Sequence, residues 1–141
     1  MTKGEKAKRL FLSGKNCSQA VVLAFSEEIG LKEEDLSKLF VGFGGGFARQ
    51  RLICGAVSGM NAVISFCKSD GDKVKAYALV QKAIEEVNKE LGSIICGELL
   101  SGITSDTSPN AEKRTAKYYK KRPCADICAL CATVAEKIIK E

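Results

Sequence analysis

Residues 52–67 read LICGAVSGMNAVISFC and form the longest stretch of the chain without a charged residue. The stretch is too short to cross a membrane, because a transmembrane helix needs about 20 predominantly apolar residues. It also contains the polar residues Ser58, Asn61 and Ser65. We therefore predict a buried central helix at residues 52–66 and no association with a membrane.

Helical periodicity continues on both sides of this stretch, and no segment of useful length alternates apolar and polar residues as a strand would. The most regular pattern lies at residues 73–91. Its apolar face is predicted to contain Val74, Tyr77, Ile84, Val87 and Leu91. Further helices are predicted at residues 2–12, 17–29, 33–40, 95–100, 111–119 and 124–140. The fold is therefore expected to be all-α: one domain over residues 1–141, a helical bundle of about five main helices with additional short helical turns.

Turn and capping residues separate these predicted helices. Asn16 is a favourable N-cap for the helix that starts at Cys17, and Gly30 is a favourable C-terminal cap. The segment GFGGGF at residues 42–47 is expected to be a flexible turn. It is not a dinucleotide-binding fingerprint, because Phe47 occupies the third glycine position.

Composition excludes several classes of function. None of the 141 residues is histidine, which excludes His-dependent catalytic triads, His-ligated haem and His-containing zinc sites. The formal net charge of +5 is too small to indicate nucleic-acid binding by itself. The chain starts MTKGEKAKR, with charges where a secretory signal needs an apolar segment. We therefore expect a cytoplasmic, reducing location, where permanent disulfides are rare.

Four of the seven cysteines share a local setting, because each is expected to lie at the start of a helix. They are Cys17, Cys54, Cys96 and Cys124. The partial positive charge of a helix N-terminus, together with nearby Lys and Arg residues, favours a thiolate over a thiol. Thiolates bind metals and attack disulfides, so we predict these four residues as metal ligands. The alternative interpretation is that small cysteines fill core positions.

The other three cysteines have a different setting. Cys67 ends the central helix and is interpreted as a core or incidental residue. Cys128 and Cys131 follow Cys124 at positions i+4 and i+7, on one face of the predicted last helix. A buried seam of the bundle is the preferred interpretation for this pair, and supplementary metal ligands are the alternative.

The central helix contains a motif that also occurs in a known protein family. Cys54-Gly55-Ala56-Val57-Ser58-Gly59 fits C-G-A-x-x-G, and Cys17 lies in NCSQAV, Cys96 in CGELL and Cys124 in RPCA. With these residues, the chain resembles the redox-active protein family named for its C-GCAxxG-C-C cysteine pattern, from about Leu10 to Ile139.

The resemblance implies redox chemistry at the four cysteines and an all-helical fold related to the cluster-bearing part of split-Soret cytochromes. Gly55 and Gly59 leave one helix face without side chains, where a neighbouring backbone or a bound cofactor can approach closely. We therefore expect Gly55, Ala56 and Gly59 to bind a cofactor, with tight helix packing as the alternative. The chain departs from the family in its three additional cysteines and in Ala48–Arg51 before the motif. It has no C-x-x-C-H sequence, so covalent haem is not expected.

Three functions remain open, and no residue is assigned a catalytic role. The first is electron transfer through an iron–sulfur cluster bound by the four cysteines, which air can destroy during purification. The second is thiol–disulfide exchange by a reversible long-range pair, since the four cysteines lie in separate segments. The third is a structural zinc site of four cysteines in a helical interaction module, although the two C-x2-C pairs typical of such sites are missing.

Residues 111–122 contain six basic residues together with Tyr118 and Tyr119. Basic and aromatic residues in combination can bind single-stranded nucleic acid. We prefer a solvated helix face beside an electronegative cluster, and we expect no nucleic-acid partner. The same charges are suited to attract an acidic redox partner protein.

Overall fold

Helix α6 (Gly55–Lys68) is the central element of the computed structural model, which describes residues 1–141. Met60 and Val63 in this helix have no exposed surface. The predicted buried helix is confirmed, although it begins at Gly55 rather than at Leu52. Cys54 is its N-cap and has an extended backbone conformation, with φ −52° and ψ 130°.

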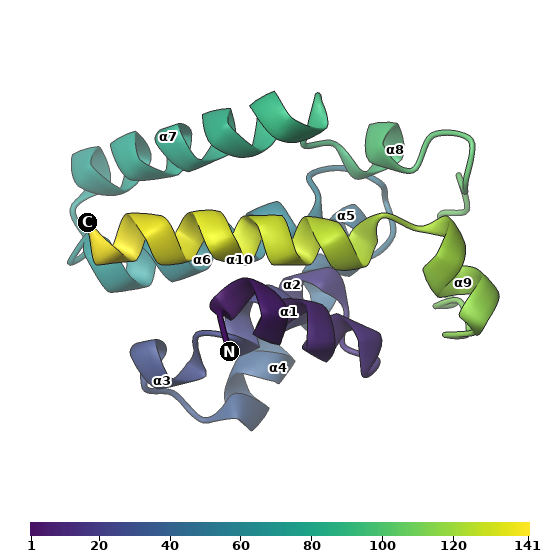
Figure 1. Cartoon of the computed structure of the whole chain (residues 1–141), viewed down its shortest axis with the longest axis horizontal. Helices are drawn as coiled ribbons and strands as arrows, with labels where there is room; N and C mark the ends of the chain where they lie inside the picture. The colour runs from purple at the N-terminus through teal and green to yellow at the C-terminus, as the bar shows by residue number, and fades with distance from the viewer.

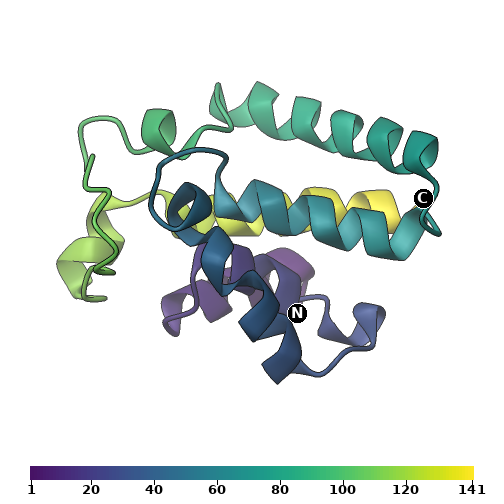
Figure 2. The ribbon, with the colours of Figure 1, turned by 180° about the vertical axis from the view of Figure 1, so that it is seen from behind.

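Four helices form the bundle together with α6 (Figures 1 and 2). They are α1 (Lys3–Leu12), α2 (Cys17–Leu23), α7 (Lys73–Leu91) and α10 (Cys124–Lys140). Helices α2, α7 and α10 pack directly on α6, and α1 packs across α10 and α2. The five helices enclose one continuous apolar core, which confirms an all-α bundle.

Shorter segments connect the five helices of the bundle. They are α3 (Ser26–Ile29), α4 (Glu33–Phe40), the 3-10 helix η1 (Val41–Phe43), α5 (Gly44–Phe47), α8 (Cys96–Leu99) and α9 (Ala116–Lys121). One isolated antiparallel bridge between Ile53 and Ile95 is the only β-type pairing. Figure 1 shows that α8 and α9 lie at the end of the bundle where α10 begins. No helix is both long enough and apolar enough to cross a membrane.

A reciprocal cap fixes the start of α2. The Asn16 side chain accepts a hydrogen bond from the Gln19 backbone N–H, and the Gln19 side-chain oxygen accepts one from the Asn16 N–H, both at 3.0 Å. The predicted cap at Asn16 is therefore confirmed, and it determines that Cys17 is the first helical residue. Gly30 adopts φ 77° at the end of α3, as predicted for a C-terminal cap.

The prediction of one continuous helix over residues 17–29 is wrong. The chain forms α2, bends at Ala24 and Phe25, and then forms α3. Phe25 has φ −109° and ψ 20° and is completely buried. The bend turns this large ring into the core, and helical periodicity alone gives no signal for it.

The predicted limits of α7 are confirmed, but part of its predicted apolar face lies in solvent. Val87 is buried, whereas Val74 and Tyr77 are 77% and 63% exposed. The side chain of the terminal residue Glu141 pairs with Lys82 of α7 at 3.0 Å. Val74 and Tyr77 therefore lie on a part of α7 that the core does not cover.

Replacing Gly59 by valine is expected to destabilise the fold by about 1–3 kcal/mol, the usual cost of overpacking. A Cβ atom on Gly59 would lie 3.0 Å from the Ser18 carbonyl oxygen and 3.2 Å from Val21 Cβ. A larger side chain would therefore push α2 and α6 apart. Chemical denaturation measures the change, with Gly42→Val as control because Gly42 faces open space. Equal stabilities of the two variants would contradict the close packing.

Candidate functional site

Four helix starts surround one cavity at the end of the bundle near α8. Cys17, Cys96 and Cys124 are the first residues of α2, α8 and α10, and Cys54 is the N-cap of α6. All four residues line the same cavity of about 360 Å³. The predicted position of each cysteine at a helix start is confirmed, and the structure brings the four predicted ligands to one space.

Backbone pairing fixes Cys54 and Cys96 relative to each other. The N–H of Cys54 donates to the Ile94 carbonyl oxygen at 2.8 Å, and the N–H of Cys96 donates to the Leu52 carbonyl oxygen at 2.6 Å. Two segments separated by about 40 residues in sequence therefore enter their helices side by side.

A left-handed turn at residues 45–51 wraps around this part of the site. Every residue of the turn except Gln50 has a positive φ. The left-handed conformation costs roughly 1–2 kcal/mol for each residue that has a Cβ atom. Gly46 is required by space as well, because a Cβ atom there would lie 2.8 Å from Cys96 Cβ. The predicted turn at residues 42–47 overlaps this segment at residues 45–47, and such strained backbone is common near functional sites.

The sulfur of Cys17 lies against the start of α6. A Cβ atom on Gly55 would lie 2.5 Å from Cys17 Sγ, so only glycine permits this approach. The Cys54 thiol and the backbone N–H groups of Gly45 and Ser18 lie near the Cys17 sulfur and act to lower the pKa of its thiol.

These contacts give the two sulfurs different protonation states. The hydrogen bond from Cys54 is the largest effect on Cys17 and, with the backbone donors, it outweighs burial and lowers the pKa of Cys17 to about 6. The same hydrogen bond, together with burial, raises the pKa of Cys54 well above its ordinary value. At neutral pH the pair therefore consists of a Cys17 thiolate and a Cys54 thiol.

The expectation that all four cysteines are thiolates is wrong for the protein without a bound cation. Burial raises the pKa of Cys96, although Arg51 opposes the change. Burial, and then the negative charge of Cys17, raises the pKa of Cys124 to about 11 against the effect of Arg122. The field at a helix N-terminus is too weak to ionise several buried sulfurs that repel one another. A bound metal cation would reverse this balance, because coordinating thiols lose their protons.

Four arginines line the cavity together with the cysteines. They are Arg49, Arg51, Arg114 and Arg122. Arg51 Nη1 lies 3.7 Å from Cys96 Sγ, and the positive charge of Arg122 acts to lower the pKa of Cys124. Glu112 is the only acidic side chain in the lining, so positive charge exceeds negative charge there and the cavity is suited to an anionic occupant.

The segment 104–112 passes beside the cavity and is held there by arginine side chains. Arg51 donates through Nε and Nη2 to the Asp106 carbonyl oxygen at 3.1 and 2.9 Å. Arg49 donates to the carbonyl oxygens of Ser108 and Asn110, and Arg122 pairs with the Glu112 carboxylate. The guanidinium groups thus connect this segment to the left-handed turn and to the start of α10.

The three residues of the C-G-A-x-x-G motif that were predicted to bind a cofactor have different surroundings. Gly55 lines the cavity, whereas Ala56 and Gly59 are buried away from its walls. Gly59 faces Ser18, Val21 and Val22 of α2. Tight packing of α2 on α6, the alternative interpretation, therefore accounts for Gly59, and Gly55 contacts both α2 and the cavity.

The remaining cysteines lie outside the cavity walls. Cys128 and Cys131 are fully buried in the apolar core, as the interpretation of a bundle seam requires. The Cys128 thiol lies 3.8 Å from the Cys17 carbonyl oxygen, so it packs against the backbone of α2 at the first residue of that helix. Cys67 is partly buried in the last turn of α6.

The comparison with known proteins agrees with this arrangement. The family model described as "Putative redox-active protein (C_GCAxxG_C_C)" matches residues 15–138. The chain belongs to this family. A protein of Archaeoglobus fulgidus, described as "Uncharacterized protein", is 26% identical over 150 residues, which cover 100% of this chain and 98% of that protein. No solved structure matches the chain. The match to the family includes all four cysteines of the cavity.

The sequence predicts four cysteines that line this cavity, but it gives no signal for much of the wall around them. Asp106, Ser108 and Asn110 accept hydrogen bonds from Arg49 and Arg51, and the sequence gives no indication of this role. Carbonyl oxygens occur at every residue, so no sequence signal marks the ones that an arginine will reach. The expected helical turn at residues 111–119 lies at 116–121 instead, because the Thr115 side chain caps it by accepting from the Tyr118 N–H.

In the reduced protein without metal, one cysteine is expected to ionise near pH 6, and the others well above neutral pH. Ultraviolet absorbance of the thiolate measures this titration. Cys54→Ala should raise the pKa of Cys17 because it removes the hydrogen-bond donor, whereas Cys54→Ser keeps a donor and should raise it less. Because the pKa of Cys17 is lowered by folding, its thiolate stabilises the fold at alkaline pH, and this contribution is lost as the pH falls through about 6. A transition near pH 6 that persists in Cys54→Ala would contradict this assignment.

Proposed function

We propose that Cys17, Cys54, Cys96 and Cys124 hold an iron–sulfur cluster and that the protein transfers electrons. The observation that carries the proposal is the convergence of these four residues, from four separate helix starts, on one cavity. Four cysteine thiolates are the usual ligands of such clusters. When bound, the cluster supplies reversible one-electron chemistry.

The charges of the cavity support this proposal. A cluster with four thiolate ligands carries a net negative charge, which is costly to bury without compensation. Arg51 Nη1 lies 3.7 Å from the Cys96 sulfur, and Arg122 lowers the pKa of Cys124 against the effect of burial. These donors would stabilise ionised sulfur and thereby influence the reduction potential, because hydrogen bonds to cluster sulfurs are one of its determinants.

The structure gathers no three potential ligands around a single point, and this arrangement favours a cluster over a single zinc ion. Zinc–sulfur bonds of about 2.3 Å in a tetrahedral site place the ligand sulfurs about 3.8 Å apart. No three Cys, Asp or Glu side chains are gathered closely enough to surround one ion. A cluster distributes its ligands over several irons, so it suits sulfurs that line the walls of a larger cavity.

Anaerobic reconstitution with iron and sulfide is expected to give the wild-type protein a broad charge-transfer absorbance and bound iron. Cys54→Ser and Cys124→Ser should each lose most of both signals, because each removes one ligand. Cys67→Ser is the matched control and should bind as much iron as the wild type, since Cys67 lies outside the cavity. A colourless wild-type protein, or an equal loss in the control, would exclude the proposed cluster.

Reversible disulfide formation is a second candidate, and the contact between Cys17 and Cys54 favours it. A thiolate beside a protonated thiol is the arrangement from which a disulfide forms by exchange. The Cys17 thiolate would attack oxidised glutathione and release one glutathione thiolate. Cys54, after losing its proton, would displace the second glutathione and close the disulfide, a two-electron oxidation of the protein.

Oxidised glutathione is expected to remove two of the seven free thiols of the wild-type protein if this second function operates. Thiol counting and mass spectrometry measure the loss and identify the linked residues. Cys17→Ser and Cys54→Ser should both prevent the internal disulfide, and Cys96→Ser should not. An unchanged thiol count after oxidation would rule out reversible pairing.

A further inference from the structure

The basic residues between 113 and 122 separate into two groups with different surroundings. The two arginines turn inward. Arg114 donates to the carbonyl oxygens of Phe11 and Lys15 at 3.0 Å, with its guanidinium 4.3 Å from the centre of the Phe11 ring. The Arg122 side chain is only 7% exposed and lies over Tyr118.

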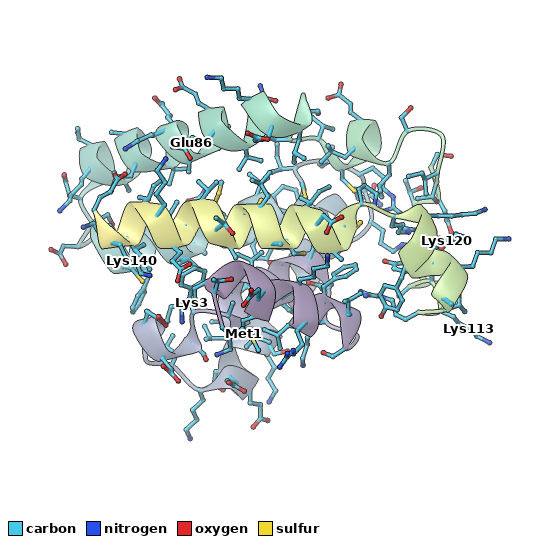
Figure 3. All side chains as sticks on the ribbon, in the orientation of Figure 1. Met1, Lys3, Glu86, Lys113, Lys120 and Lys140 are labelled. Atoms are coloured by element: carbon cyan, nitrogen blue, oxygen red, sulfur yellow. The ribbon has the colours of Figure 1, made fainter.

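The lysines of the same segment turn outward. They are Lys113, Lys117, Lys120 and Lys121, all exposed, and none has a carboxylate within 4 Å. Figure 3 shows Lys113 and Lys120 at the outer end of the molecule, where they extend away from the bundle. The nearest acidic residues in sequence are already paired, Glu112 with Arg122 and Asp126 with Lys8. The outer surface of residues 113–121 therefore carries four positive charges that the chain itself does not neutralise.

The position of α9 connects this face with the cysteine cavity. Tyr118, on the inner side of α9, lines the cavity, and Cys124 follows α9 after a short connection. An α-helix with its side chains is about 10–12 Å across. A protein that binds the lysines would therefore lie about one helix diameter from the cavity, which is close enough for its redox group to approach the site.

We propose that Lys113, just before α9, together with Lys117, Lys120 and Lys121 on α9 forms the docking surface for an acidic electron-transfer protein. This inference rests on the proposed redox function. Unpaired lysines at the edge of a protein–protein interface accelerate the encounter with a negatively charged partner. This effect is lost as added salt screens their charges.

The surroundings of the two tyrosines favour a protein over a nucleic acid as the occupant. Binding of single-stranded nucleic acid uses aromatic rings on which bases stack. Tyr118 and Tyr119 instead pack on Phe11, with ring centres 6.5 and 6.1 Å away, and the Tyr119 hydroxyl donates to the Leu12 carbonyl oxygen at 3.1 Å. The surface around these lysines thus offers positive charge but no aromatic ring that is free to stack on a base.

The test is a titration of the isotope-labelled full chain, followed by nuclear magnetic resonance, with an acidic flavodoxin as the probe. At low ionic strength we expect shifts concentrated at residues 113–121 and weaker binding as salt is added. Lys117→Glu/Lys120→Glu should weaken binding at least tenfold. Lys73→Glu/Lys75→Glu on α7 makes the same change in net charge at an exposed, unpaired site and should weaken it less than threefold.

Equal weakening by the two double variants would overturn the proposal, because net charge alone would then explain binding. Absence of shifts with flavodoxin, or shifts only with a single-stranded oligonucleotide used as a second probe, would also overturn it. The titration uses protein with free thiols and needs no cluster. Failure of docking is therefore distinguishable from failure of cluster reconstitution.

Discussion

The close contact between α2 and α6 is the constraint on which the whole site depends. Gly55 and Gly59 present no side chains to α2, so the two helices approach until Cys17 reaches the start of α6. At that point its sulfur meets the Cys54 thiol and several backbone N–H groups. Hydrogen bonds, rather than water, then stabilise a negative charge inside the protein. The packing of the core and the chemistry of the cavity therefore share one structural cause.

Arginines and lysines have different roles around this site, and their chemistry explains why. A guanidinium group offers several donors in a fixed plane and is more weakly hydrated than an ammonium group. Arg51 uses this geometry to connect the Asp106 carbonyl oxygen with the Cys96 sulfur from a nearly buried position. The lysines of α9 keep their strongly hydrated ammonium groups in solvent. Positive charge is therefore present both within the wall of the cavity and on the surface beside it.

Local signals predicted the fold well where the chain itself determines the conformation. The Asn16 cap, the glycine at the end of α3 and the limits of α7 depend on neighbouring residues, and all three are confirmed. The bend at Phe25 and the exposure of Val74 depend on which distant helix covers each position. Periodicity does not contain that information, so these features were predicted incorrectly.

The sequence by itself determined that Cys17, Cys54, Cys96 and Cys124 lie at helix starts, because caps and turns act over a few residues. Only the tertiary structure decided that these residues meet at one cavity and that Cys17 alone carries a negative charge. The charge of a buried thiol depends on its desolvation and on its hydrogen-bond donors. Here one of those donors, Cys54, comes from a different helix, and its distance from Cys17 is set by the packing of α2 on α6.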